Sequence, residues 1–144
     1  MTTWVMVADA SRARFFRAEN RNGPLQEMAD RLHVESRLKG RDLETDGPGR
    51  SFDRAGQGRH AMGKEVDVKT HEAQRFAREL CDYLDKSAAA NEYDKLYIVA
   101  APAFLGLVRD CLANPVRKRV AGEVSKDMVN QDVQAIRATL PDFL

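Results

Sequence analysis

Long hydrophobic runs are missing from this sequence. The longest, from Leu96 to Val108, spans 13 residues and contains Pro102, whereas a helix that crosses a bilayer needs roughly 20 apolar residues. The short apolar run from Trp4 to Ala8 has no basic residues before it and is too short for the core of a secretory signal. We therefore expect a cytoplasmic protein without a membrane partner.

Cysteine and histidine are also scarce. The two cysteines, Cys81 and Cys111, lie in separate segments with helical periodicity, and we expect both to be buried, reduced thiols. The three histidines, His33, His60 and His71, lack the close spacing of a zinc site. The sequence therefore predicts no metal and no cofactor.

Neither sign of charge dominates, because the net charge is +1 at pH 7. Such a chain lacks the large positive field of a strongly basic domain, so we expect no DNA partner, and binding to RNA has to come from a local patch. The glycine-rich phosphate-binding loops of nucleotide enzymes are absent as well. A length of 144 residues suits one core, which predicts a single domain over residues 1–144.

The first part of the chain shows the pattern of antiparallel strands. The apolar run 4–8 predicts a strand buried on both faces, and the turn 9–11 predicts a hairpin to a second strand over 12–19. Apolar residues at even spacing indicate a third strand within 25–34.

The last part of the chain alternates helices and strands. Thr70 can cap a helix with one apolar face, 95–101 is typical of a buried strand, and Pro102 suits the first turn of a second helix. The segment 119–124 predicts another strand, and Asn130 can cap a last helix. This order predicts an α/β (α+β) fold with a mixed sheet flanked by helices, of the ribonuclease-H-like kind.

Between these parts, from 36 to 66, periodicity is lost and six of the nine glycines occur, which predicts a long loop. Its stretch 47–64 reads GPGRSFDRAGQGRHAMGK and carries a local charge of +3. Arginine side chains bind phosphates through paired hydrogen bonds, so we predict RNA contacts by the basic residues of this stretch: Arg50, Arg54, Arg59 and Lys64. A solvated surface loop with no specific partner is the alternative.

Three other groups of residues have weaker functional interpretations. Asp9 at the end of a strand would suit a two-metal nuclease, but that chemistry needs several converging carboxylates, and capping of the hairpin turn is the alternative. Lys126 and Asp127 are expected in a surface turn that enters a helix. The basic run 117–119 would extend an RNA-binding face only if it lay beside the predicted loop.

An ordered series of segments resembles the bacterial host-attachment protein family over nearly the whole chain. The resemblance is carried by VADASRARFFRAE, a loop ending in GRH, AQRFARELCDYL, LYIVAAPAFLG and VRKRVAGEVSKDM. The family name implies a role in attachment to host cells. We expect that role to be indirect, since a cytoplasmic protein does not touch a host surface.

The same family is similar to the middle domain of eukaryotic and archaeal peptide-chain release factors, a ribonuclease-H-like fold with a Gly-Gly-Gln loop. The nearest match here is Ala55-Gly56-Gln57, with alanine in place of the first glycine. The resemblance implies that Gln57 positions water against the ester of peptidyl-tRNA, while Ala55, Gly56 and Gly58 form the loop backbone. His60 follows closely, and its ordinary pKa suits proton transfer near neutral pH.

Two functions therefore stay open. The first is a ribosome-associated, release-factor-like peptidyl-tRNA (ester) hydrolase, with the ribosome or tRNA as partner and Gln57 and His60 as catalytic residues. The second is a non-enzymatic RNA- or protein-binding module that affects host attachment indirectly.

Overall fold

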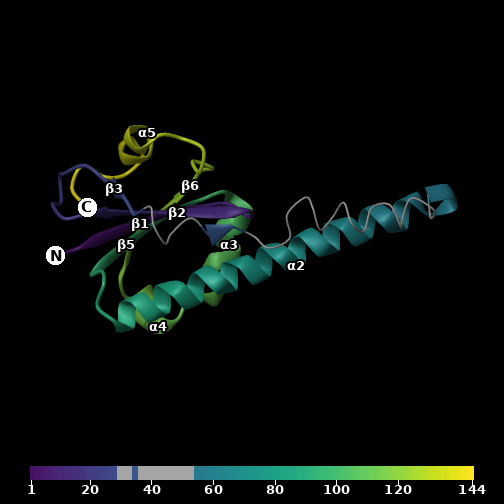
Figure 1. Cartoon of the computed structure of the whole chain (residues 1–144), viewed down its shortest axis with the longest axis horizontal. Helices are drawn as coiled ribbons and strands as arrows, with labels where there is room; N and C mark the ends of the chain where they lie inside the picture. The colour runs from purple at the N-terminus through teal and green to yellow at the C-terminus, as the bar shows by residue number, and fades with distance from the viewer. Residues whose placement is uncertain (29–33, 36–53) are drawn as a thin grey trace.

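The computed structural model describes residues 1–28, 34–35 and 54–144. It contains a mixed β-sheet with helices on both faces (Figure 1), which confirms the predicted fold class. In chain order the elements are β1 (Thr3–Ala8), β2 (Arg12–Ala18), β3 (Gln26–Glu27), β4 (Val34–Glu35), α2 (Arg54–Ala89), β5 (Lys95–Ala100), α3 (Pro102–Cys111), α4 (Asn114–Arg117), β6 (Val120–Ser125) and α5 (Val133–Ala138).

β1 occupies the middle of the sheet. The strand order is β3-β2-β1-β5-β6, and β4 also pairs with β2. β1 is antiparallel to β2 and parallel to β5, which is in turn parallel to β6. A central first strand with these neighbours is the order of a ribonuclease-H-like fold. Every residue of β1 is buried, as expected for a strand that is covered on both faces.

The side chains of β1 alternate between two apolar cores. Trp4 and Met6 belong to the core beneath α2 and α3, which we call the α2–α3 core, whereas Val5 and Val7 belong to the core beneath α5, the α5 core. The buried residues that α2 contributes to the α2–α3 core are Phe76, Ala77, Leu80, Cys81, Leu84 and Ala88. The sheet therefore separates two hydrophobic layers.

The helix α2 is longer than its periodicity predicts. It has 36 residues and begins at Arg54 rather than at Thr70. The predicted loop 36–66 is corrected accordingly: residues 54–66 are helical, and residues 36–53 lie outside the described part of the chain. Glycine in a helix costs about 1 kcal/mol relative to alanine. Here the glycines alternate with strong helix formers, and the segment only has to extend a helix whose nucleation cost is already met by packing.

Two further boundaries differ from the sequence prediction. In place of one strand within 25–34, β3 and β4 are two-residue strands, and each pairs with β2. α5 is capped by Asp132 rather than Asn130, because the Asp132 carboxylate accepts a hydrogen bond from the Ala135 amide at 2.8 Å. Both residue types are good caps, so only the position of the helix on the sheet selects between them.

The two cysteines are paired, contrary to the prediction of reduced thiols. Cys81 on α2 and Cys111 on α3 form a disulfide, and their Cα atoms are 6.1 Å apart. This separation lies within the usual range for disulfides. A gap of 30 residues in the sequence carries no information about distance in space, which the packing of α3 against α2 decides.

Candidate functional site

The parallel strands β1, β5 and β6 end side by side. Ala8 is paired with Ala100, and Ala100 with Ser125, so their last residues form a row. The residues that follow directly are Asp9, Ala101 and Lys126. We call the row and these three residues the carboxyl edge. Ligands of open α/β sheets bind outside the carboxyl ends of the strands, so this edge is the first place to look for a site.

Asp9 has a structural task at the carboxyl edge. One of its carboxylate oxygens, Oδ1, accepts hydrogen bonds from the amides of Ser11 at 2.8 Å and Arg12 at 2.9 Å. The Asp9 amide donates to the Arg12 carbonyl at 3.0 Å, which closes the turn between β1 and β2. Within the described residues, no group of three or more His, Cys, Asp or Glu side chains could hold a metal ion. Turn capping therefore accounts for Asp9.

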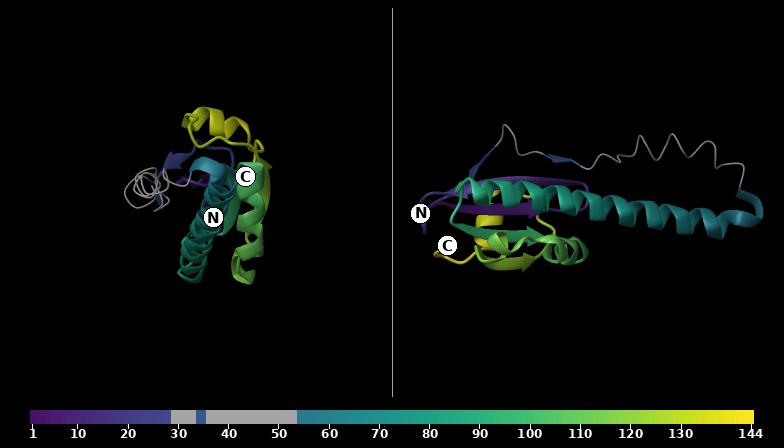
Figure 2. Two further views of the ribbon diagram at one scale, coloured as in Figure 1. Left: turned by 90° about the vertical axis from the view of Figure 1, so that its right-hand side faces the viewer. Right: turned by 90° about the horizontal axis from the view of Figure 1, so that it is seen from below.

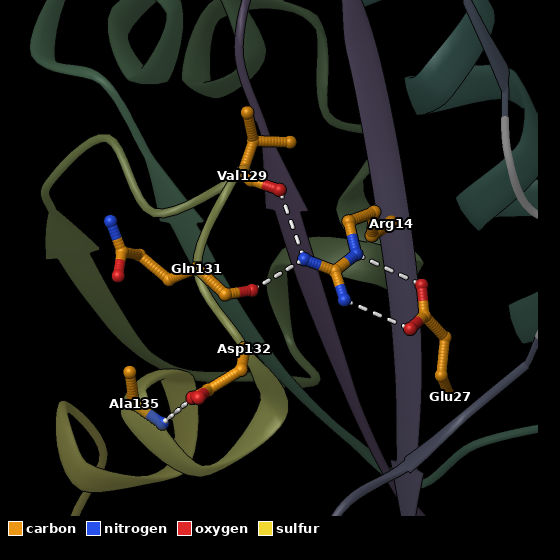
Figure 3. Close-up of polar contacts among 6 residues, drawn as sticks. All are labelled: Arg14, Glu27, Val129, Gln131, Asp132 and Ala135. Atoms are coloured by element: carbon orange, nitrogen blue, oxygen red, sulfur yellow. Dashed lines mark hydrogen bonds and ion pairs between the residues drawn. The ribbon is translucent and has the colours of Figure 1, made fainter.

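Arg14 holds the segment that leaves the carboxyl edge after β6 (Figure 3). Its Nη1 donates to the carbonyl oxygens of Val129 at 2.9 Å and Gln131 at 2.7 Å. Its Nε and Nη2 donate to the two carboxylate oxygens of Glu27 on β3, both at 2.9 Å. One side chain from β2 thus fixes the path of the chain between β6 and α5. Lys126 and Asp127, at the start of that path, are exposed, as predicted for a surface turn.

The guanidinium of Arg14 is charged although its side chain is only 15% exposed. The hydrogen bonding of Arg14 to Glu27 and the negative charge of this carboxylate raise the pKa of Arg14 against the opposing effect of burial. The guanidinium also lies 5.1 Å from the centre of the Phe16 ring. Sequence analysis missed this residue. The signal was present, because alternation along the strand puts Arg14 on the same face as the apolar Phe16.

The helix α2 extends past the carboxyl edge. Its contacts with the α2–α3 core run from Ala73 to Ala88, and residues 90–94 connect it to the start of β5. Figures 1 and 2 show that it runs antiparallel to β5, so its N-terminal part projects from the carboxyl edge and away from the sheet. With a rise of 1.5 Å per residue, residues 54–72 span about 28 Å. We call residues 54–72 the projecting segment.

The projecting segment carries most of the candidates from the sequence. The residues with helical backbone are Arg54, Ala55, Gly56, Gln57, Gly58, Arg59, His60 and Lys64. Their side chains, and the whole of Arg50, lie outside the described part of the structure. Helix positions three and four apart share a face, so positions 57, 60 and 64 follow one side of α2. Position 59 is turned about 200° from position 57.

The basic run Arg117–Arg119 lies at the opposite end of the sheet, directly before β6 begins. The Nε atom of Arg117 donates to the carbonyl of Leu112 at 2.9 Å, and the guanidinium of Arg119 lies 5.7 Å from the centre of the Tyr93 ring. These contacts tie α4 and β6 to the body of the protein. The run therefore does not lie beside residues 54–64, and it does not extend an RNA-binding face there.

No helix in the described ranges has the length and apolar character to cross a bilayer.

Comparison with known proteins places this fold in a family. The family model described as "Protein required for attachment to host cells" matches residues 4–140, a range that begins within β1 and extends past the end of α5. An uncharacterized protein of Rickettsia prowazekii (strain Madrid E) is 37% identical over 73 residues, which cover 49% of this chain and 49% of that protein. The chain thus aligns with about half the length of this relative. On the match over 4–140, the chain belongs to the family of proteins required for attachment to host cells.

Proposed function

We propose that this member of the host-attachment family is a ribosome-associated protein whose projecting segment contacts ribosomal RNA or tRNA, and that it acts on host attachment indirectly. The observation that carries the proposal is the position of residues 54–64, in the part of α2 that extends beyond the carboxyl edge (Figure 1). Residues 54–64 include three basic residues, Arg54, Arg59 and Lys64, and no acidic residue. A positive helix end that stands clear of the sheet suits a polyanion.

The start of α2 adds a second source of positive potential. The first four amides of a helix have no acceptor within the helix, and the helix dipole makes this end positive. In α2 these amides belong to Arg54, Ala55, Gly56 and Gln57, and the first turn contains no acidic residue. This arrangement suits a phosphate or a developing oxyanion.

In the catalytic form of the proposal, the projecting segment hydrolyses the ester of peptidyl-tRNA. Gln57 would hold the attacking water through its side-chain amide, and first-turn amides would stabilise the oxyanion. His60, on the same side of the helix as Gln57, would accept the proton of that water. Arg54, Arg59 and Lys64 would contact RNA.

A binding experiment tests the RNA contact. The double variant Arg59→Gln/Lys64→Gln should bind ribosomes more weakly, and the slope of log affinity against log salt should become shallower by about 1.5, since two phosphate contacts are lost. The matched control, Lys86→Gln/Lys118→Gln, removes two charges from exposed positions outside the projecting segment, in the last turn of α2 and directly after α4, and should leave both quantities unchanged. Equal losses in the two double variants would refute a specific contact by the projecting segment.

A release experiment tests the catalytic form separately. The full chain is added to stalled ribosomes, and release of the peptide is compared for the wild type, Gln57→Ala, His60→Ala and the control Gln131→Ala, a change at an exposed residue. Release that is lost with Gln57→Ala and kept with Gln131→Ala supports hydrolysis. Release that survives unchanged in Gln57→Ala removes the mechanism and leaves the RNA contact standing.

The helical backbone at Ala55–Gln57 favours the second candidate, a module that binds RNA or a protein without hydrolysis. A Gly-Gly-Gln loop uses glycine for conformations outside the helical region, whereas residues 55–57 are part of α2. Ribosome binding without release of peptide is the outcome that this candidate predicts. Binding to a protein and not to ribosomes would replace the RNA partner.

A further inference from the structure

The disulfide between α2 and α3 joins two sulfur atoms with unequal access to solvent. Cys81 is 4% exposed and lies in the α2–α3 core, whereas Cys111 is only partly buried. Cys111 also lines a surface hollow of about 350 Å³, together with Gln74, Arg78, Leu107 and Asp110. Of the two cysteines, Cys111 is therefore the one that a thiol from solution reaches more easily.

The same site has acceptors for two thiols in the reduced state. The Sγ atom of Cys81 lies 3.5 Å from the carbonyl oxygen of Val108 on α3, and the Sγ atom of Cys111 lies 3.4 Å from the carbonyl oxygen of Ala77 on α2. Both contacts cross between the helices. The helices also have an apolar contact besides the cross-link, between the rings of Phe76 and Phe104, whose centres are 5.7 Å apart. The disulfide is therefore not the sole link between α2 and α3.

We propose that Cys81 and Cys111 form a reversible redox clamp, opened and closed by thiol–disulfide exchange at Cys111, which sets how firmly α2 is attached to α3. Exposed disulfides are the exchangeable ones in proteins, and fully enclosed disulfides resist exchange. The exchange partner is a dithiol, either a protein with two neighbouring thiols or dithiothreitol in the laboratory. The proposal does not rest on binding to RNA.

The opening reaction balances as two successive exchanges. A thiolate of the dithiol attacks the Cys111 sulfur, the bond between the two protein sulfurs breaks, and the Cys81 sulfur leaves as a thiolate that takes a proton. The second thiolate of the dithiol then attacks the dithiol sulfur that is bonded to Cys111. The Cys111 sulfur leaves as a thiolate and is also protonated. The protein gains two electrons and two protons, and the dithiol becomes a disulfide. Closure is the reverse reaction with a disulfide as oxidant.

Single-cysteine variants test the point of attack. Cys81→Ser retains Cys111, and Cys111→Ser retains Cys81; both are treated with glutathione disulfide, and the mixed disulfide is followed by mass spectrometry. Cys111 should form the adduct at least about 10-fold faster, because thiol reactivity requires access. Circular dichroism verifies that both variants are folded. Equal rates, or a faster reaction of Cys81, would overturn the assignment.

The wild type tests the clamp without any substitution. The protein is reduced with dithiothreitol, and in a quenched sample that is then alkylated both cysteines should carry the label. In the reduced protein, the ratio of folded to unfolded molecules in urea should fall about 100-fold. Amide hydrogen exchange of α3 should accelerate while β1 stays protected. Cysteines that remain reduced in the presence of glutathione disulfide, or exchange rates that do not change on reduction, would refute the clamp.

Discussion

At the scale of single residues, the charged side chain of Arg14 holds the structure together near the carboxyl edge. The apolar pattern of β2 alone does not call for a charged residue at this position. Arg14 joins β2 to β3 and to the segment before α5 through four hydrogen bonds. Lysine would keep the charge but lacks the planar fork that reaches a carboxylate and two carbonyls at once. The geometry, rather than the charge alone, makes the residue important.

Replacement of Arg14 by methionine should lower the free energy of unfolding by about 2–3 kcal/mol, because two carbonyls and a carboxylate lose a charged donor. Arg14→Lys should give an intermediate loss. The matched control is Arg109→Met, which removes an arginine that is 54% exposed and paired with Glu123; its cost should be much smaller than that of Arg14→Met, because exposed ion pairs contribute little to stability. Urea unfolding measures all three, and equal costs for Arg14→Met and Arg109→Met would contradict the role given to Arg14.

Tyr93 gives the protein a pH dependence at alkaline pH. Burial raises the pKa of Tyr93 to about 12, and the nearby positive charge of Arg119 opposes part of this effect. The hydroxyl donates a hydrogen bond to the carbonyl of Leu84 at 2.8 Å. The folded state therefore holds the proton to a higher pH than the unfolded state, whose tyrosine has a pKa of about 10.

The stability due to Tyr93 is thus complete below pH 10 and is lost as the pH rises from about 10 to about 12, by about 1 kcal/mol per pH unit. Urea unfolding at pH 9 and pH 11 should show a larger loss for the wild type than for Tyr93→Phe, which has no hydroxyl to titrate. Parallel losses in the two proteins would show that another group carries the effect.

At the scale of elements, two glycines show how the same substitution depends on its surroundings. Gly106 lies inside α3, and a Cβ atom added there meets no atom within 4 Å. Gly122 lies on β6, and a Cβ atom there would lie 3.0 Å and 3.1 Å from two atoms of the buried Tyr97 ring on β5. The register between β5 and β6 shifts at this point, so Gly122 allows the two strands to pair closely.

Gly106→Ala should therefore stabilise the protein by about 0.5–1 kcal/mol, since alanine restricts the unfolded chain and favours the helix. Gly122→Ala should destabilise it by about 1–2 kcal/mol, because the Tyr97 ring has to move within a packed layer. Thermal unfolding of both variants gives the comparison. A stabilised Gly122→Ala would mean that the ring shifts without cost.

At the scale of the whole molecule, the sheet separates two cores that fold together. Leu84 lies in the α2–α3 core and Ile136 in the α5 core, and both are fully buried. Their side chains lie on opposite sides of the central strands, too far apart to share partners. Neither core should nevertheless stay folded without the other, because β1 supplies residues to both.

Leu84→Ala and Ile136→Ala should each lower the free energy of unfolding by about 2–4 kcal/mol. The double variant should equal the total of the two single losses to within about 0.5 kcal/mol, as expected for independent sites. Fluorescence of Trp4 and far-ultraviolet circular dichroism should follow one transition in each single variant. Two separate transitions would show that the cores unfold independently.

The amino-acid sequence by itself determined the mixed sheet, the hairpin of β1 and β2, the buried strand β5 and the start of α3 at Pro102, because each depends on local periodicity and turn chemistry. It also carried the family resemblance and the basic character of residues 47–64. Tertiary structure decided the rest. Three features join residues that are distant in the sequence: the pairing of Cys81 with Cys111, the hydrogen bonds of Arg14, and the short strands β3 and β4. The periodicity of a sequence reports on local structure and does not predict such contacts. The extension of α2 to Arg54 depends on a helix that packing between Ala73 and Ala88 has already stabilised. The glycine-rich segment by itself has no core contacts to offset the unfavourable free energy of helix nucleation.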